Sequence, residues 1–466
     1  MKAKYTMETL VNKLKVNNID LYKELFENYI QNGHSHSSSD ILNAPREIAF
    51  QKFLKKGIPN FRVEKYKYTD LNKYLDKEFY PLLKPQEIDF NIDDIFKCDI
   101  PELDTQVVIL LNGYYYHKLN FEDGIQKNII VESMQEAAQK YPELIKKHYR
   151  QYADEDEESL VALNSAFAQD GLFIHVPRNT VMEKPIQIIN LAMGEDDLMI
   201  QHRNLFIFEE NTDGKILVCD HSLSPRQFLT NQVAEIYAGE NAHIDITKIQ
   251  NAHNETIQLT HSYIHQERDS NVSHNTVTLH GGLVRNNVSV RLNGEGANHD
   301  VLGLYITDSG QHVDNYVFMD HAVPHATSNQ LFKGILDDFS RGVFNGKIYV
   351  RKDAQQTLAY QANNNLLLTD DAKMNAKPQL EIYADDVKCS HGATVGQLDR
   401  DALFYIKSRG IDAKEARLML MYGFVYDIIK EIKMEPLKHR IKELVNKRLR
   451  GEMSRCNNCD INCGEK

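Results

Sequence analysis

Short apolar runs recur through the middle of the chain, separated by polar or turn-forming residues. In the densest part they recur roughly every ten residues, with Asn, Gly, Asp or His between them. Runs of this length and composition predict β-strands. The clearest runs lie at residues 107–111, 186–189, 205–208, 216–218, 244–246, 277–279, 288–290, 301–304, 316–319, 348–350 and 380–382.

Such a long series of strands fits a large sandwich, a propeller or a parallel β-solenoid. A propeller would show a repeat of about 40 residues, and a sandwich would show more Asn-Gly or Asp-Gly hairpin turns. The polar stretches instead contain many asparagines, which tolerate left-handed turns and can stack from coil to coil. We therefore predict a mainly β protein built on a parallel β-helix. The asparagines are Asn271, Asn286, Asn298, Asn315, Asn329, Asn345 and Asn364.

Both ends of the chain have a helical pattern, and inside the strand-rich region the only predicted helix covers about residues 132–150. Asp412 and Glu415 resemble a capping box at the start of a C-terminal helix. The predicted organisation is a helical domain at 1–100, a β-helix core at 101–396, a helical domain at 397–452 and a flexible tail at 453–466. One apolar face follows the capping box and consists of Leu418, Met421, Tyr422, Val425, Ile428, Ile429 and Ile432.

Composition narrows the functional classes. The 466 residues carry a formal net charge of −12, which weighs against nucleic acid as the main partner. No stretch approaches the roughly 20 apolar residues of a membrane span, and no secretory signal is recognisable at the N-terminus. Six cysteines are too few for a disulfide framework in a chain of this length. We therefore expect a cytoplasmic protein without a membrane partner.

No enzymatic motif is recognisable. The nearest approach to a phosphate-binding loop, residues 342–348, has the wrong spacing and ends in Ile348, which has no hydroxyl to hold magnesium. A nucleophile elbow and a dinucleotide fingerprint are also missing from the sequence. We therefore predict no catalytic residue, and any ATP that the function requires would be bound by a partner.

Cys389 and His391 form the sharpest chemical signal. Two residues apart on a strand point the same way, so a thiol and an imidazole would share one face. Both groups suit iron, zinc or a nascent cluster, although spacing alone also fits a buried thiol beside a turn histidine. His321 and His325 are four apart, but Pro324 argues against a helix, and these histidines fit either a stacked polar ladder or a metal site.

The block at residues 388–394, Lys-Cys-Ser-His-Gly-Ala-Thr, resembles the SufB/SufD family of the SUF iron–sulfur cluster assembly system, and within it the SufD branch. The resemblance extends through residues 363–368, 377–382, 404–405, 408–411 and 423–424, and back to residues 57–59 and 67–69. It implies a right-handed parallel β-helix flanked by N-terminal and C-terminal helices. It also implies a non-catalytic scaffold subunit that pairs with a SufB-like paralogue.

Further expectations come from the same resemblance. Cys389 and His391 would lie near the interface with the paralogue and serve cluster assembly on a transient iron or iron–sulfur cluster shared with it. A SufC-like ABC ATPase would dock on the C-terminal helices, for which the apolar stripe suggests four residues, and the chain alone would form a homodimer. The family also implies FAD on the complex, although no flavin site is recognisable. The four docking residues are Met421, Phe424, Val425 and Ile428.

The tail lies outside this resemblance. Cys456, Cys459 and Cys463 have a spacing that could bind zinc or iron, or they could be inert thiols of a polar tail. An alternative reading of the whole chain is a β-helix polysaccharide lyase or hydrolase. Such enzymes usually act on secreted polymers and need a carboxylate cluster, and the C-terminal helices would have no obvious use in one.

Overall fold

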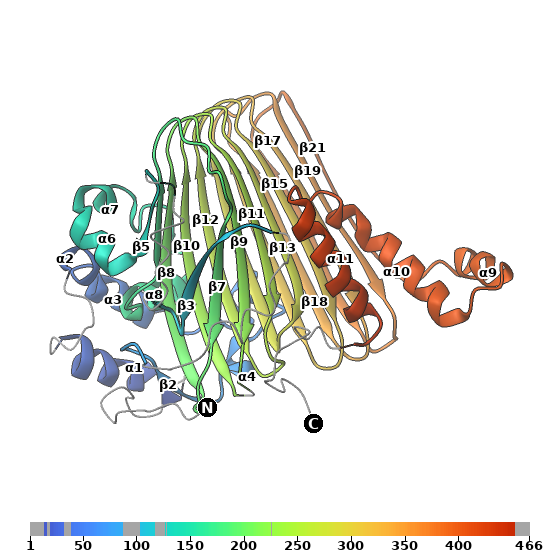
Figure 1. Cartoon of the computed structure of the whole chain (residues 1–466), viewed down its shortest axis with the longest axis horizontal. Coiled ribbons are helices and arrows are strands. Elements are labelled where there is room, and N and C mark those ends of the chain that lie inside the picture. The colour runs from blue at the N-terminus through green and yellow to red at the C-terminus, as the bar shows by residue number, and fades with distance from the viewer. Residues whose placement is uncertain are drawn as a thin grey trace.

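A computed structural model of the chain describes residues 14–15, 19–31, 39–86, 103–116, 126, 128–224 and 226–452. Its centre is a β-solenoid in which successive strands alternate between two facing sheets (Figure 1). Within the described residues these sheets have 11 and 10 strands, and nearly all neighbouring strands are parallel. The prediction of a mainly β protein with a parallel β-solenoid and helices at both ends is confirmed.

The sheets are named here by their size. The 11-stranded sheet contains β1 (Leu14–Lys15), β2 (Glu78–Pro81), β5 (Ile130–Ser133), β6 (Leu172–Val176), β8 (Leu198–Phe208), β10 (Phe228–Ala238), β12 (Ile257–Gln266), β14 (Leu283–Leu292), β16 (His312–His321), β18 (Arg341–Val350) and β20 (Lys373–Ile382). The 10-stranded sheet contains β3 (Gln106–Leu111), β4 (Tyr114–Tyr115), β7 (Ile186–Ala192), β9 (Asp213–Ser222), β11 (His243–Asn251), β13 (Asn271–His280), β15 (Asn298–Thr307), β17 (Thr327–Leu336), β19 (Thr357–Leu367) and β21 (Val387–Gly396).

An asparagine ladder runs along one line of turns. Asn211 and Asn241 both have a left-handed backbone, with φ of 57° and 54°. The Asn241 amide donates to Asn211 over 2.9 Å, and the Asn211 amide donates to Asn179 over 3.0 Å. The asparagines singled out in the sequence instead lie within strands, where the Asn286 amide donates to Asn315 over 3.1 Å. The predicted stacking from coil to coil is therefore present for Asn286 and Asn315, but the expected place of these asparagines in turns is wrong, because they lie within strands.

The interior of the solenoid is mostly apolar. One inward-facing column of side chains runs through Phe206, Ile236, Ile264, Val290, Met319 and Ile348, all of which belong to one buried cluster. Polar groups interrupt this core at several levels, including the strands near its C-terminal end. In the N-terminal half, the Lys248 ammonium lies 2.9 Å from the Asp220 carboxylate, and both side chains are buried.

Short helices cover the outer face of the 11-stranded sheet near the start of the solenoid (Figure 1). An aromatic cluster joins them, in which the rings of Phe26 and Phe50 stack at 4.2 Å. The region includes α1 (Ile19–Leu25), η1 (Phe26–Gln31), α2 (Asp40–Asn43), α3 (Arg46–Lys56), η2 (Glu64–Tyr66) and α4 (Leu71–Tyr74).

The single helix predicted near residues 132–150 is two helices, α6 (Met134–Lys140) and α7 (Pro142–His148), and Pro142 begins the second. A third helix, α8 (Ser159–Phe167), was missed. All nine of its residues are buried between α3 and the solenoid, so its sequence has no polar face and no helical period.

The C-terminal helices leave the solenoid after β21. They are α9 (Arg400–Ser408), α10 (Ala413–Ile429) and α11 (Glu435–Leu449), and α9 projects away from the solenoid in Figure 1. Asp412 caps α10 as predicted, because its carboxylate accepts hydrogen bonds from the backbone N–H groups of Lys414 and Glu415. The Glu415 carboxylate pairs with Arg450 over 3.0 Å and does not complete a capping box. None of the helices described here is long and apolar enough to cross a membrane.

Candidate functional site

Cys389 and His391 lie on β21, at the end of the solenoid. β21 pairs with β19, placing Cys389 beside Ala359 and His391 beside Gln361. Cys389 packs against the apolar cluster that fills the solenoid, so its side chain faces inward. His391, two residues later, shares that inner face. The prediction that the thiol and the imidazole point the same way therefore agrees with the strand geometry.

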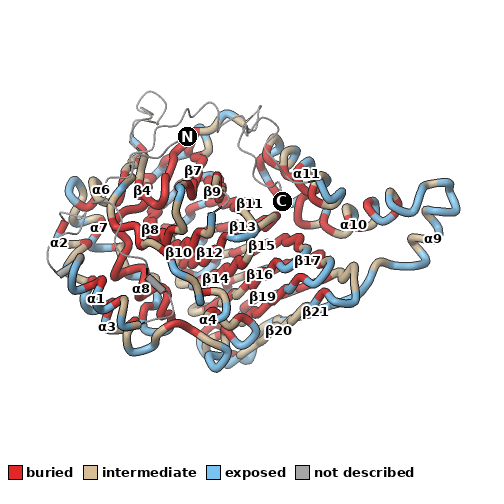
Figure 2. Tube along the Cα trace, turned by 90° about the horizontal axis from the view of Figure 1, so that it is seen from below, coloured by how far each residue is buried: buried red, intermediate tan, exposed pale blue. Residues whose placement is uncertain are grey.

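This end of the solenoid is open. β20 and β21 are the last strands of their sheets, and no described strand pairs with their outer edges. Their residues are mostly half-buried or exposed, in contrast to the preceding strands (Figure 2). The inner face that is closed elsewhere is thus accessible here, and we call this region the mouth of the solenoid.

The two donors differ in their surroundings. Cys389 is half-buried, and desolvation raises the pKa of its thiol above the ordinary value, although a hydrogen bond with the Ala359 backbone acts in the opposite direction. The free thiol is therefore protonated at neutral pH, and a metal ion would favour the thiolate. His391 is exposed, and none of the described residues forms a hydrogen bond with its imidazole.

Polar side chains line the inner face directly below the mouth, and sequence reasoning did not identify their role. The Tyr305 hydroxyl donates to Asn365 Oδ1 over 2.5 Å, and the Asn365 amide donates to Asn363 over 2.7 Å. On the same strand as these asparagines, the Gln361 amide donates over 2.7 Å to Gln330, which lies one coil further in. The signal in the sequence is the recurrence of polar residues at 361, 363 and 365, which places these three on one face of a strand although Asn364 between them is polar too.

The histidine-rich stretch gives no metal site in the described part of the chain. No group of three or more His, Cys, Asp or Glu side chains is arranged there to hold a metal ion. His321 is fully buried and its Nε2 lies 2.9 Å from the Ser328 hydroxyl, whereas His325 occupies a left-handed turn position. Burial lowers the pKa of His321 to about 4, so it is a neutral core residue.

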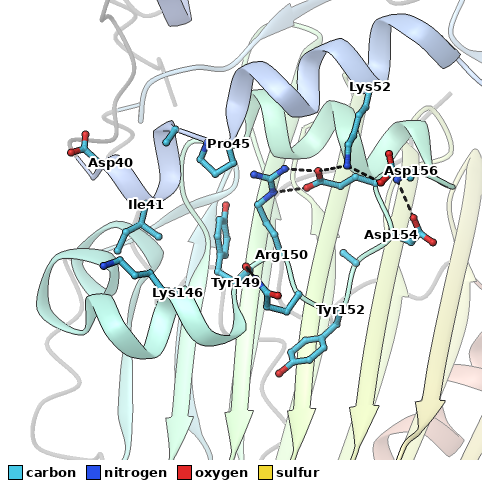
Figure 3. Close-up of a pocket in the computed structure, with 14 residues that line it drawn as sticks. Asp40, Ile41, Pro45, Lys52, Lys146, Tyr149, Arg150, Tyr152, Asp154 and Asp156 are labelled. Atoms are coloured by element: carbon cyan, nitrogen blue, oxygen red, sulfur yellow. Dashed lines mark hydrogen bonds and ion pairs between the residues drawn. The ribbon is translucent and has the colours of Figure 1, made fainter. Parts of the chain in front are cut away.

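A cleft of about 770 Å³ lies far from the mouth, between the α2–α3 junction, α7 and the loop that follows α7 (Figure 3). Two of the basic side chains that line it form ion pairs. Arg150 binds Glu155 through two nitrogens, and the Lys52 ammonium lies 2.9 Å from Asp156. These ion pairs hold the walls of the cleft together.

The apolar stripe on α10 is core and not a free surface. Met421, Val425 and Ile428 are at most 5% exposed and pack against α11 and the outer face of the 10-stranded sheet. Their assignment as an exposed docking surface is therefore wrong, because the solenoid itself covers this stripe. Phe424 is half-buried, with the Lys333 ammonium 4.7 Å from its ring centroid.

The exposed apolar side chains of this region lie elsewhere. Phe404 is 74% exposed and Tyr405 is 58% exposed, and α9 has no buried residue. Met419 and Tyr426, on the outer side of α10, are 48% and 41% exposed. The three tail cysteines, Cys456, Cys459 and Cys463, lie outside the described residues.

Comparison with known proteins covers nearly the whole chain. Residues 190–424 match the family described as "SUF system FeS cluster assembly, SufBD core domain", and residues 16–188 match the "SufBD protein N-terminal region". The core match contains Cys389 and His391. It ends within α10, so it also includes α9.

Proteins of similar sequence support the same family assignment. An iron–sulfur cluster assembly SufBD family protein from Synechocystis is 30% identical over 455 residues, which are 96% of this chain and 99% of that protein. SufD of Escherichia coli is 29% identical over 86% of this chain and 92% of its own length. SufD of Bacillus subtilis is 23% identical over 84% and 89%. These matches favour cluster assembly over the lyase alternative, and the chain belongs to the SufBD family of iron–sulfur cluster assembly proteins.

Proposed function

We propose that this chain is a non-catalytic scaffold subunit that completes a cluster-assembly site together with a SufB-like paralogue. The observation that carries the proposal is the position of Cys389 and His391 on the inner face of the last strand, at an open end of the solenoid. Two donors of this kind suit iron and iron–sulfur clusters. The iron or cluster is cargo that passes through the site.

The open end favours a protein partner. The outer edges of β20 and β21 present backbone N–H and C=O groups that native proteins rarely leave uncovered. Apolar side chains surround these edges and would be buried by a partner: Tyr360, Ile382, Tyr383 and Val395 are between 39% and 58% exposed. Pairing at a sheet edge is a common mode of recognition. The SufB-like paralogue would cover the mouth, and a second copy of this chain would do so when the paralogue is absent.

Such pairing would also complete the ligand set. A tetrahedral metal site needs about four ligands, and the mouth supplies two from this chain. The partner would contribute the others, so neither subunit would hold the cluster alone. This accounts for a site that has only a half-buried thiol and an exposed imidazole before the partner arrives.

A SufC-like ABC ATPase would dock on α9 and the outer side of α10. Phe404 and Tyr405 are exposed aromatic residues on a helix that buries no side chain of its own, and exposed anchors of this type often dominate interfaces. Lys333 on β17 holds α10 to the solenoid, because its ammonium donates to the Phe424 carbonyl over 2.8 Å and to Asp427 over 2.7 Å. The ATPase would thereby contact a helix pair that is fixed to the solenoid.

The test is co-expression with a SufB-like paralogue and a SufC-like ATPase, followed by anaerobic measurement of iron and sulfide in the purified complex. His391→Ala and Cys389→Ser should lower the iron and sulfide content while leaving subunit stoichiometry unchanged. Ser390→Ala is the matched control, because Ser390 lies between them on the outer face of β21 and is exposed. Full cluster loading in both variants would refute the proposal, and loss of the paralogue would show an interface role without chemistry.

A further inference from the structure

A pair of buried carboxamides lies directly inside the mouth. Gln361 on β19 is 3% exposed and Gln330 on β17 is fully buried. The two residues are register partners on neighbouring strands, and Gln361 Nε2 donates to Gln330 Oε1 over 2.7 Å. The nitrogen of the Gln361 amide is therefore committed to the interior side of the stack.

The oxygen of the same Gln361 amide has no hydrogen-bond partner in the described part of the chain. This atom, Oε1, is also buried. Buried side-chain acceptors in folded proteins are nearly always satisfied, so an unpaired carboxamide oxygen beside an accessible mouth points to a donor that arrives there.

The opposite sheet leaves space for this amide. A Cβ atom at Gly346 would lie 2.3 Å from Gln361 Nε2 and 2.7 Å from its Cδ, so any larger residue would displace the carboxamide. Gly346 pairs with Pro378 on the last strand of that sheet, and proline has no backbone N–H to offer. Gln330 Nε2 is also buried without a partner among the described residues, but Gln330 belongs to the coil on the interior side, so a donor on the mouth side of the Gln361 amide would come from the last coil.

His391 is the register partner of Gln361 in the last coil, on the same inner face. Neighbouring strands lie about 4.8 Å apart, which brings an imidazole within reach of a glutamine side chain. The ring carries at least one N–H group, and in the described structure it has no hydrogen bond that would hold it elsewhere.

We propose that Gln361 is the positioning residue for His391. Its buried oxygen accepts the N–H of one imidazole nitrogen, so the lone pair of the other nitrogen is directed out of the mouth. A second hydrogen bond of this kind fixes the tautomer and orientation of metal-binding histidines in general. The use of that lone pair in cluster assembly rests on the proposed function, whereas the hydrogen bond itself does not.

The test measures the tautomer of His391 in the full-length protein by ¹⁵N NMR of labelled histidine side chains, with His391→Ala identifying its signals. In the unsubstituted chain one tautomer should dominate. Gln361→Met should change the ratio of tautomers by about fivefold, the effect of one lost hydrogen bond. Gly346→Ala, which displaces the carboxamide without removing it, should act in the same direction. Gln361→Glu, which keeps an oxygen at this position, should preserve the dominant tautomer.

Gln379→Met is the matched control, because Gln379 is on the outer face of β20 and should leave the ratio unchanged. An unchanged ratio in Gln361→Met, in a protein that folds normally, would overturn the proposal. That result is distinguishable from failure of the proposed function, which would appear as full cluster loading in His391→Ala and would leave the NMR result intact.

Discussion

The guanidinium of Arg285 lies over the ring of Tyr66, with 3.8 Å between its central carbon and the ring centroid. Arg285 is on β14 and Tyr66 is in the segment after α3, so this contact joins residues far apart in the chain. Arg285 also forms an ion pair with buried Asp314 and donates to the Lys65 carbonyl over 2.8 Å. One buried arginine therefore ties the N-terminal segment to the solenoid.

Replacing this arginine should release the segment. Arg285→Met leaves the Asp314 carboxylate buried without its cation, which typically costs about 3–5 kcal/mol. We expect a lower free energy of unfolding in urea and faster proteolysis between α3 and α4. Arg291→Met is the control, because Arg291 is exposed on the same strand. Equal stability of the two variants would contradict a structural role for this contact.

The interior should make the protein sensitive to acid. Burial, together with the nearby Lys248, lowers the pKa of His274 from 6.5 to about 4. The unfolded chain therefore takes up a proton at a pH where the folded chain does not, so this histidine lowers stability as pH falls from about 6.5 towards 4. At pH 5.5 the loss is about 1 kcal/mol relative to pH 7.5.

Thermal unfolding between pH 7.5 and 5.5 would measure this effect. His274→Leu should reduce the difference between the two pH values, since an apolar side chain suits that interior position. His439→Gln is a control on an exposed face of α11 and should leave the difference as it is. A pH dependence that persists unchanged in His274→Leu would assign the acid sensitivity to other groups.

The exposed helix α9 allows a direct test of ATPase docking. Phe404→Asp should abolish co-purification of the ATPase without changing thermal stability, because the Phe404 ring is 74% exposed and α9 buries nothing. Val425→Asp should instead destabilise the chain, because Val425 is completely buried. Retention of the ATPase by Phe404→Asp would move the docking surface off α9.

The cysteine tail is tested by truncation after Gly451. If Cys456, Cys459 and Cys463 bind zinc or iron, the full-length chain should hold about one more metal equivalent than the truncated chain under anaerobic conditions. A triple Cys→Ser variant controls for the length of the tail. Equal metal content in all three proteins would leave the tail without a role in metal binding.

The sequence correctly predicted features that depend only on neighbouring residues, such as strand faces and helix caps. Strand alternation is enough to place Cys389 and His391 on one face, and the Asp412 cap needs only the next three residues. The stripe of Met421, Val425 and Ile428 was correctly seen as apolar, but its burial depends on β-strands far away in the sequence. Whether such a stripe meets the same chain or another protein is a tertiary property.

Two features that the sequence did not predict, α8 and the relation of Gln361 to His391, also depend on tertiary structure. α8 has no polar face because the solenoid and α3 surround it completely, so periodicity could not identify it. The relation of Gln361 to His391 depends on which residues are register partners in adjacent coils, and the coils vary in length. A pairing of this kind becomes visible only when the strands are placed in space.

The asparagine ladder has a consequence for how such a chain can change in length. Asn211 and Asn241 are 30 residues apart and occupy equivalent turns. Duplication of the segment between them would insert one complete coil, extending the solenoid by about 4.8 Å while every inward-facing side chain remains inward. An insertion of one residue within a strand would instead reverse its faces. The length of the solenoid can therefore change only by whole coils if its inward-facing positions are to be kept. The distance between the N-terminal helices and the mouth would change in the same steps.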